Sequence, residues 1–138
     1  MYYNIKEYTD YNPREILPLY QSVGWTNYTD RPDMLEQAYR HSLKAYAACV
    51  GERLVGVVRV IGDGFSVVFV QDLLVHPEYQ RQGIGTTLLK TVLEEYRDVY
   101  QLHLLTDHTE KTTTFYQSLG LVMDTDVGCR AFSKYHTN

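Results

Sequence analysis

The sequence predicts one α/β domain with a mixed, mostly antiparallel central sheet flanked by about four helices. Three observations lead to this fold class. The 138 residues suffice for one domain, residues 1–138, with a hydrophobic core, and they leave little room for a second. Apolar segments with strand and helix periodicity alternate along the chain. Residues 65–106 have the pattern strand, helix, strand, which implies one parallel pair joined by a right-handed crossover.

The first half of the chain is expected to form a strand, two helices and two more strands. Residues 2–8 alternate loosely between apolar and polar side chains, as in a strand. Asn12-Pro13 begins a helix to about residue 23, which Pro18 should kink or shorten. Arg31-Pro32-Asp33 begins a second helix with one apolar face. The two strands, residues 45–50 and 53–61, pair as a hairpin.

The second half is expected to continue with a long strand over residues 65–75, whose apolar second half should be buried on both faces. A helix follows from Thr86 to about Arg97, with apolar side chains at helical spacing. The remaining elements are a short strand, a short helix and two closing strands, over residues 101–106, 110–118, 121–125 and 129–135.

Composition and charge restrict the partners and the location. The formal net charge of -4 argues against nucleic acid or an anionic membrane as the main partner and mildly favours a cationic one. No apolar run approaches the ~20 residues of a membrane span. The N-terminal sequence MYYNIKEYTD lacks the basic and apolar regions of a secretory signal, so we expect a cytoplasmic protein.

One loop in the second half combines features of an anion-binding site. The segment 76-HPEYQRQGIGTTLLK-90 connects the expected buried strand to a helix, with Gly83 and Gly85 one residue apart. Glycines let backbone N–H groups approach a ligand, and the first helical turn adds unpaired N–H donors. Arg81 can add a charge-assisted contact. The loop therefore predicts a phosphate site, and a plain glycine turn with a helix cap is the alternative.

Two common nucleotide-binding motifs do not match this loop. A Walker A loop needs a Lys after its last glycine, and here Thr86 follows Gly85. A dinucleotide-binding fingerprint needs a third glycine, and Leu88 stands in that position.

The longer pattern resembles the acyl-CoA signature of the GNAT superfamily of N-acetyltransferases, [QR]-x-x-G-x-[GA], over residues 80–85. Residues 74–79 match the approach V-x-P-x-[YF] of that family. Further along the chain, 115-FYQSLGL-121 resembles its second signature, and the expected order of strands is similar too. The resemblance covers nearly the whole chain and implies the GNAT fold.

This resemblance implies acetyl-CoA as cosubstrate, with no metal, and direct transfer of the acetyl group to a primary amine. Backbone groups of Leu73, Leu74 and Val75 would bind the pantetheine arm as an added strand. The pyrophosphate would lie against the loop residues Arg81, Gln82, Gly83, Ile84, Gly85 and Thr86.

The resemblance also implies that Tyr116 points at the thioester sulfur. A phenol, with a reference pKa of ~10, can protonate the leaving thiolate there. A core tyrosine on an amphipathic helix is the alternative. Asp72 is the leading candidate for the general base, because a carboxylate in an apolar strand needs pairing, catalysis or substrate binding to explain it. A structural salt bridge is its alternative role, and His103, Asp107, His108 or an ordered water are the other base candidates.

The segment 22-SVGWTNYTDRP-32 lies between the first two helices, where GNAT members usually build the acceptor site. Together with 61-IGDG-64 and 71-QDL-73, it resembles the plant-type and bacterial serotonin (arylalkylamine) N-acetyltransferases. Trp25 and Tyr28 could stack on an aromatic or aliphatic amine. Its cation could be attracted by Asp30, Asp33 or Asp72. In the alternative, Trp25 only fills the edge of the core.

We therefore expect an N-acetyltransferase that acts on a small primary amine of the aryl, alkyl or polyamine type. A protein Lys or N-terminal acetyltransferase is one alternative, although the aromatic loop would crowd a peptide. A non-catalytic acyl-CoA-binding regulatory domain is another. Many GNAT domains dimerise through their C-terminal strands, and 127-VGCRAFSKY-135 is apolar enough to pair in a homodimer.

Overall fold

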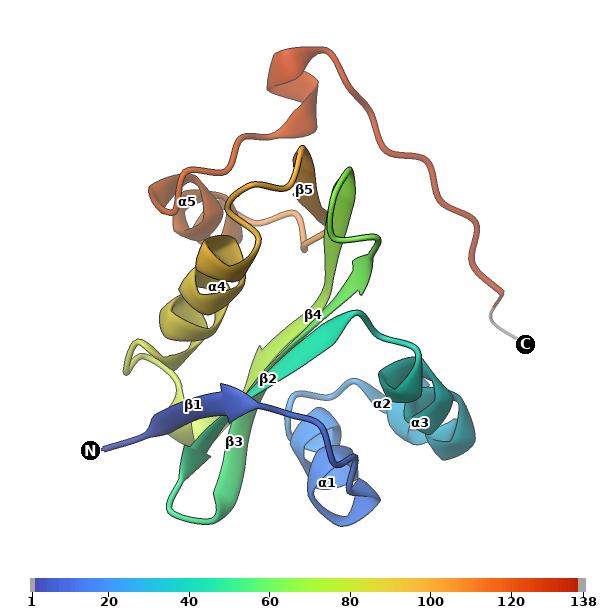
Figure 1. Cartoon of the computed structure of the whole chain (residues 1–138), viewed down its shortest axis with the longest axis vertical. Helices are drawn as coiled ribbons and strands as arrows, with labels where there is room; N and C mark the ends of the chain where they lie inside the picture. The colour runs from blue at the N-terminus through green and yellow to red at the C-terminus, as the bar shows by residue number, and fades with distance from the viewer. Residues whose placement is uncertain (1, 137–138) are drawn as a thin grey trace. The chain divides into compact units, whose positions relative to one another are not determined.

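The computed structural model describes residues 2–136, which form two compact units, one up to Leu105 and one from Thr106 (Figure 1). The elements of the first unit are β1 (Asn4–Glu7), α1 (Pro13–Ser22), α2 (Thr26–Thr29), α3 (Pro32–Arg40), β2 (Lys44–Val50), β3 (Arg53–Gly62), β4 (Val67–Val75), a 3-10 turn (Pro77–Tyr79), α4 (Ile84–Glu95) and β5 (Gln101–Leu104). The second unit contains α5 (Glu110–Ser118) and a 3-10 turn (Asp124–Val127).

The strands of the first unit form one sheet in the order β1-β2-β3-β4-β5. Neighbouring strands are antiparallel except β4 and β5, which are parallel and connected through α4. The predicted mixed, mostly antiparallel sheet and its one parallel crossover are therefore confirmed. β5 pairs with β4 only from Val67 to Val70, so the second half of β4 extends beyond it.

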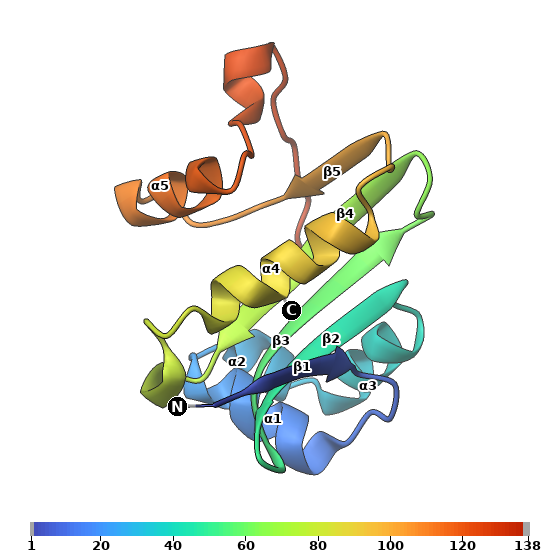
Figure 2. The same cartoon turned by 60° about the vertical axis from the view of Figure 1, so that its left-hand side comes forward.

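Helix α4 covers one face of the sheet, and α1, α2 and α3 lie on the other (Figures 1 and 2). Gly56 in β3 allows α4 to pack closely, because a Cβ there would lie 3.2 Å from Leu74 O and 3.3 Å from Leu88 Cδ1. The core on the opposite face consists of buried apolar side chains. They include Ile16, Leu19, Leu35, Ala47, Leu54, Val57 and Leu74.

An irregularity in β4 decides which way Asp72 points. Asp72 pairs with Arg59, whereas the next residue of β3, Val60, pairs with Val70, so Gln71 is an extra residue in β4. Side chains alternate along a regular strand, which would place Val70 and Asp72 on the same face. The bulge instead places Asp72 beside Arg59 on the face covered by α1–α3, where it meets side chains of those helices.

The two closing strands predicted over residues 121–125 and 129–135 are wrong. Residues Asp124–Val127 form a 3-10 turn, and residues 129–136 have no regular secondary structure. Gly128, with φ 83°, ends the turn, and Cys129 N–H donates back to Asp124 O at 2.8 Å. Local bonds thus replace a sheet ladder here. Apolar residues form a strand only where another strand accepts them, and in the described residues none pairs with this segment.

Smaller differences concern the helices. The short α2 was not predicted, because four residues are too few to show a helical period. Helix α4 begins at Ile84, two residues before the predicted Thr86, directly after Gly83 in a left-handed conformation. Helix α1 continues past Pro18 to Ser22. Within residues 2–136, no helix has both the length and the apolar character needed to cross a membrane.

Candidate functional site

The outer edge of β4 has no strand beside it from Gln71 to the end of the strand. β5 pairs with β4 only as far as Val70, and no other strand of residues 2–136 adjoins that edge. An unpaired strand edge presents N–H and C=O groups that can bind an extended chain. The residues predicted to bind the pantetheine arm, Leu73, Leu74 and Val75, lie in this open stretch.

The loop after β4 leads into the N-terminus of α4. Arg81 and Gly83 both have positive φ, 64° and 83°. For Arg81 a left-handed backbone costs about 1 kcal/mol, a strain that functional loops often carry. Thr87 N–H donates to Gly83 O at 2.9 Å, as the first helical bond at this end. The N–H groups before it, which belong to the predicted pyrophosphate loop, have no partner within the helix. They are those of Ile84, Gly85 and Thr86.

Contacts inside the first unit hold the helix start beside the open edge. A Cβ on Gly85 would lie 3.8 Å from Val75 Cγ2, so the two segments meet. Gln80 Nε2 donates to Val75 O at 2.9 Å, and Tyr3 Oη lies 2.8 Å from Thr87 Oγ1. The open edge and the unpaired N–H groups are therefore neighbours, as a ligand with an extended arm and a phosphate end requires.

Asp72, the predicted base, lies in a buried polar cluster. Only 2% of Asp72 is exposed, and its Oδ2 forms an ion pair with Arg59 Nε at 2.8 Å. Tyr20 Oη donates to Oδ2 at 2.7 Å, and Tyr28 Oη donates to Oδ1 at 3.1 Å. Tyr39 Oη lies 2.9 Å from Tyr20 Oη. One carboxylate thus connects α1 and α2 to β3 and β4, and through Tyr20 it is also linked to α3.

The charges in this cluster balance, because Arg59 neutralises Asp72. Burial alone would lower the pKa of Arg59, but the adjacent Asp72 carboxylate raises that pKa above its ordinary value. Burial also raises the pKa values of Tyr20, Tyr28 and Tyr39, with Asp72 adding to the effect, so these phenols stay protonated near neutral pH. Of the roles the sequence left open for Asp72, the salt bridge is present, and the roles as base and in attracting the acceptor cation stay predictions.

Trp25 and Tyr28, predicted to bind the acceptor, lie next to this cluster. Their ring centroids are 6.2 Å apart, and they lie 5.9 and 5.3 Å from the ring of Tyr20. Trp25 packs against the buried core, as its alternative role required. Tyr28 is half-buried, and its Oη accepts a long hydrogen bond of 3.4 Å from Nε2 of the exposed Gln71. The structure thus brings Tyr28 and Asp72 into direct contact.

The second unit contains Tyr116, on α5. The ring centroids of Tyr116 and Phe115 are 4.9 Å apart. Burial raises the pKa of the Tyr116 phenol, and a hydrogen bond with Thr106 partly opposes that shift. Thr109 caps the N-terminus of α5, and its hydroxyl accepts from Thr112 N–H at 3.3 Å. The role of Tyr116 toward the thioester stays a prediction.

Two other base candidates are held in local bonds. His103 Nε2 lies 3.1 Å from Gln101 Oε1 on β5. The Asp107 carboxylate accepts from the hydroxyls of Thr109 and Thr112 at 2.9 and 2.7 Å, and these bonds lower its pKa. Asp107 therefore supports the start of α5. Across residues 2–136, no cluster of three or more His, Cys, Asp or Glu side chains could hold a metal ion.

Sequence reasoning missed Arg59, Tyr20 and Tyr39, which complete the cluster around Asp72. One signal was present: Arg59 interrupts an apolar strand as Asp72 does, and a buried charge needs a partner. Pairing the two strands would have suggested the ion pair. The tyrosines gave no such signal, because their positions on α1 and α3 fit ordinary core residues.

A profile of the acetyltransferase (GNAT) family matches residues 8–121. The chain belongs to this family. A GNAT-family acetyltransferase from Streptococcus pneumoniae TIGR4 is 44% identical, with a TM-score of 0.89, and the match covers 99% of this chain and 100% of that one. The predicted GNAT fold is therefore confirmed.

Two relatives named uncharacterised N-acetyltransferases extend the comparison. They are the ycf52 protein of Gracilaria tenuistipitata var. liui, 25% identical over 122 residues, and the ycf52-like protein of Prochlorococcus marinus, 30% identical over 116 residues. The matches cover 83% and 80% of this chain but only 64% and 62% of those relatives. The narrower resemblance to serotonin N-acetyltransferases and the expected cytoplasmic location stay predictions.

Proposed function

We propose that this GNAT chain transfers the acetyl group of acetyl-CoA to the primary amine of a small molecule. One observation carries the proposal: the open edge of β4 ends at Val75, directly beside the unpaired N–H groups at the start of α4. A GNAT acetyltransferase from Elizabethkingia anophelis, 20% identical with a TM-score of 0.64, was solved with acetyl-CoA bound, which supports this choice of cosubstrate.

The two features fit different parts of acetyl-CoA. The pyrophosphate is an anion, and the helix start offers N–H donors with partial positive charge, beside the exposed Arg81. The pantetheine arm carries amides that can pair with the edge of β4 between Val75 and Leu73. The arm then ends near Gln71, because β5 occupies the edge of β4 from Val70 onward. The thioester is therefore proposed to lie near the β4 bulge.

Transfer at this position needs two proton movements. The neutral amine nitrogen attacks the thioester carbonyl, the C–N bond forms, the C–S bond breaks, and the thiolate leaves. The nitrogen gives up one proton, and the thiolate takes one. We propose Tyr116 as the donor to the thiolate and a backbone N–H near Leu74 as the donor to the oxyanion. Asp72 is committed to Arg59, which favours an ordered water over Asp72 as the group that takes the proton from nitrogen.

A small amine fits the acceptor side better than a peptide. Trp25 and Tyr28 pack against Tyr20 and against the core, and α2 contacts both α1 and α3. These aromatic rings suit an aryl or alkyl amine by stacking or apolar contact. The experiment must distinguish this function from two others. One is acetylation of a protein Lys or N-terminus, and the other is a regulatory domain that binds acyl-CoA without catalysis.

The test is thiol release from acetyl-CoA with the full chain, using arylalkyl-, alkyl- and polyamines, lysine-containing peptides, and no acceptor. We expect release with at least one small amine and reduced kcat in Tyr116→Phe, by about 10²-fold if the phenol is the general acid. Release with peptides alone would overturn the small-amine acceptor. Tight CoA binding without release in any reaction would overturn the enzymatic function.

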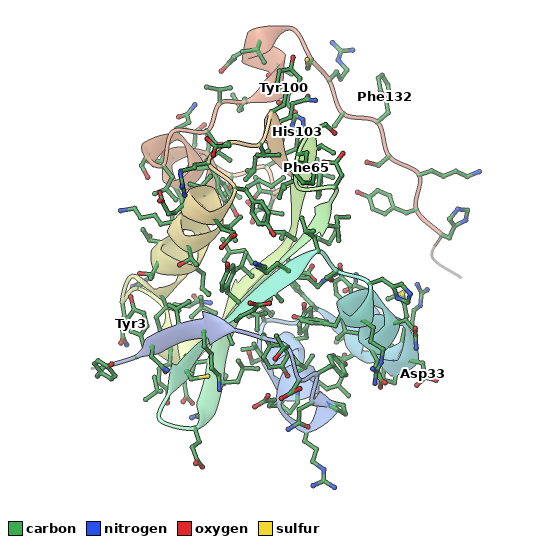
Figure 3. All side chains as sticks on the ribbon, viewed as in Figure 1. Tyr3, Asp33, Phe65, Tyr100, His103 and Phe132 are labelled. Atoms are coloured by element: carbon green, nitrogen blue, oxygen red, sulfur yellow. The ribbon has the colours of Figure 1, made fainter. Side chains whose placement is uncertain are left out.

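We also propose a homodimer. β5 is the last strand of the sheet and pairs on one side only within the described residues. The C-terminal segment exposes large apolar side chains, of which Phe132 is 88% and Tyr135 is 74% exposed. Figure 3 shows the side chain of Phe132 on this segment. Exposed apolar groups of this kind mark association surfaces. Light scattering should then give twice the 16.1 kDa mass of one chain.

A matched pair of variants tests the part of the C-terminal segment in the dimer. Phe132→Lys is expected to give a monomer, whereas Tyr2→Lys, at a position that is 84% exposed near β1, should leave the dimer intact. A wild-type chain that stays monomeric at micromolar concentration would overturn the homodimer.

A further inference from the structure

The phenol of Tyr28 stands between a buried carboxylate and solvent. Its hydroxyl donates to Asp72 Oδ1 at 3.1 Å, which commits the proton to that bond. Its oxygen accepts from Gln71 Nε2 at 3.4 Å, from a side chain that is exposed. A phenol oxygen with its proton committed can act only as an acceptor toward further partners. The Tyr28 oxygen can thus accept a hydrogen bond on the side where Gln71 lies.

Asp72 has little capacity to contact a substrate itself. Its Oδ2 already accepts from Arg59 and Tyr20, and its Oδ1 accepts from Tyr28. Only 2% of the residue is exposed. Arg59 also cancels its charge, so the pair gives little net attraction for an ammonium group. Any influence of Asp72 on an acceptor must therefore pass through Tyr28.

The position of Tyr28 agrees with the proposed path of the thioester. Gln71 is the bulge residue of β4, at the point where β5 stops adjoining the strand. The side chain of Gln71 reaches Tyr28 Oη from this point. The Gln71 amide N–H thus donates to Tyr28 Oη at the place where the N–H of an acceptor amine would donate. This hydrogen bond is long, so an amine can replace it.

We infer that Tyr28 binds the acceptor amine by accepting a hydrogen bond from its N–H, and that Asp72 and Arg59 act as positioning residues that hold the Tyr28 hydroxyl. This inference rests on the proposed function and deepens it. The group recognised is a primary amine with an apolar body, which the ring of Trp25, 6.2 Å from that of Tyr28, would contact. Recognition by one acceptor oxygen, without a free carboxylate, favours monoamines over polyamines.

The test compares Tyr28→Phe with Tyr39→Phe in the full chain. Both variants remove one hydroxyl from the same cluster and keep the ring, but Tyr39 Oη bonds to Tyr20 and makes no bond to Gln71 or Asp72. For Tyr28→Phe we expect KM for the amine to rise about tenfold, with KM for acetyl-CoA changed less than about twofold. Tyr39→Phe should leave both constants near wild type. Equal effects in the two variants, or an unchanged amine KM in Tyr28→Phe, would overturn the inference.

A second variant separates binding from folding. Gln71→Ala removes the N–H donor that competes for Tyr28 Oη and leaves the buried cluster intact. We expect an amine KM equal to or below that of wild type. A rise as large as that in Tyr28→Phe would overturn the role of Tyr28. If the wild-type chain releases no thiol with any amine, the proposed function itself is wrong. If the wild-type chain turns over and Tyr28→Phe has an unchanged amine KM, only this inference is wrong.

Discussion

Arg59 Nε lies 2.8 Å from Asp72 Oδ2, and these two side chains form a buried ion pair between neighbouring strands of the sheet. The bulge at Gln71 is what turns Asp72 toward Arg59 and the helices α1–α3. Tyr20 of α1 and Tyr28 of α2 donate to the same carboxylate, and Tyr39 of α3 is bonded to Tyr20. Through Asp72 the pair connects the sheet to the helices that cover it. It also holds the hydroxyl of Tyr28, the residue proposed to bind the acceptor amine.

Replacing Asp72 by Asn should destabilise the fold strongly. Arg59 would keep its charge without a compensating carboxylate, and breaking a buried pair in this way typically costs about 3–5 kcal/mol. Urea denaturation followed by circular dichroism would measure the loss in the free energy of unfolding.

An exposed ion pair of the same chain provides the control. Arg40 Nη2 lies 2.8 Å from Glu36 Oε2 on α3, with both side chains open to solvent. Glu36→Gln should cost less than about 1 kcal/mol. Similar losses in the two variants would mean that Asp72 and Arg59 do not hold the fold together.

Alkaline pH should unfold this protein in step with the ionisation of its buried phenols. Burial raises the pKa values of Tyr20, Tyr28 and Tyr39, whereas an unfolded tyrosine loses its proton near pH ~10. Above that pH the unfolded chain binds fewer protons than the folded chain, so the free energy of unfolding falls as pH rises. Below about pH 9 these phenols should add no pH dependence.

Thermal melts from neutral to alkaline pH would measure this. The melting temperature should hold until about pH 9 and then drop, with phenolate absorbance appearing as the protein unfolds. A constant melting temperature through the titration of all the tyrosines would contradict the burial of these three hydroxyls.

Arg81 should contribute to cofactor affinity in a salt-dependent way. Its charge lies at the proposed pyrophosphate loop, so Arg81→Ala should weaken CoA binding by about tenfold at low salt and less at high salt. Lys90→Ala removes an exposed charge farther along α4 and should change the affinity by less than about twofold. Titration calorimetry at two salt concentrations would compare the variants. Equal losses of CoA affinity in the two variants would mean that Arg81 does not contact the pyrophosphate.

The pH dependence of the reaction should follow the substrate rather than Asp72. With Asp72 paired to Arg59 and the phenols protonated, the neutral amine must come from solution. The acid limb of kcat/KM should therefore shift with the pKa of the amine when two amines that differ by about two units are compared. An acid limb that stays at the same pH for both amines would instead support a general base on the protein.

The sequence predicted the parts of this fold that depend on local pattern. The hairpin over residues 45–61, the crossover through α4 and the glycine loop all carry periodicity or turn residues that specify them. The bulge at Gln71 could not be predicted, because an extra residue in an apolar strand leaves no mark in composition. The buried phenols that surround Asp72 depend on how α1–α3 pack, which single-sequence patterns do not contain. The closing strands failed because strand formation needs a partner edge as well as apolar residues.

A crystal structure of the full chain with CoA bound tests the central claim most directly. The account predicts the pyrophosphate within hydrogen-bond distance of the N–H groups of Ile84, Gly85 and Thr86, and the pantetheine arm paired with β4 between Leu73 and Val75. The thiol end should then lie near Gln71. A pyrophosphate bound away from the start of α4, or an arm that leaves the edge of β4 unpaired, would contradict it.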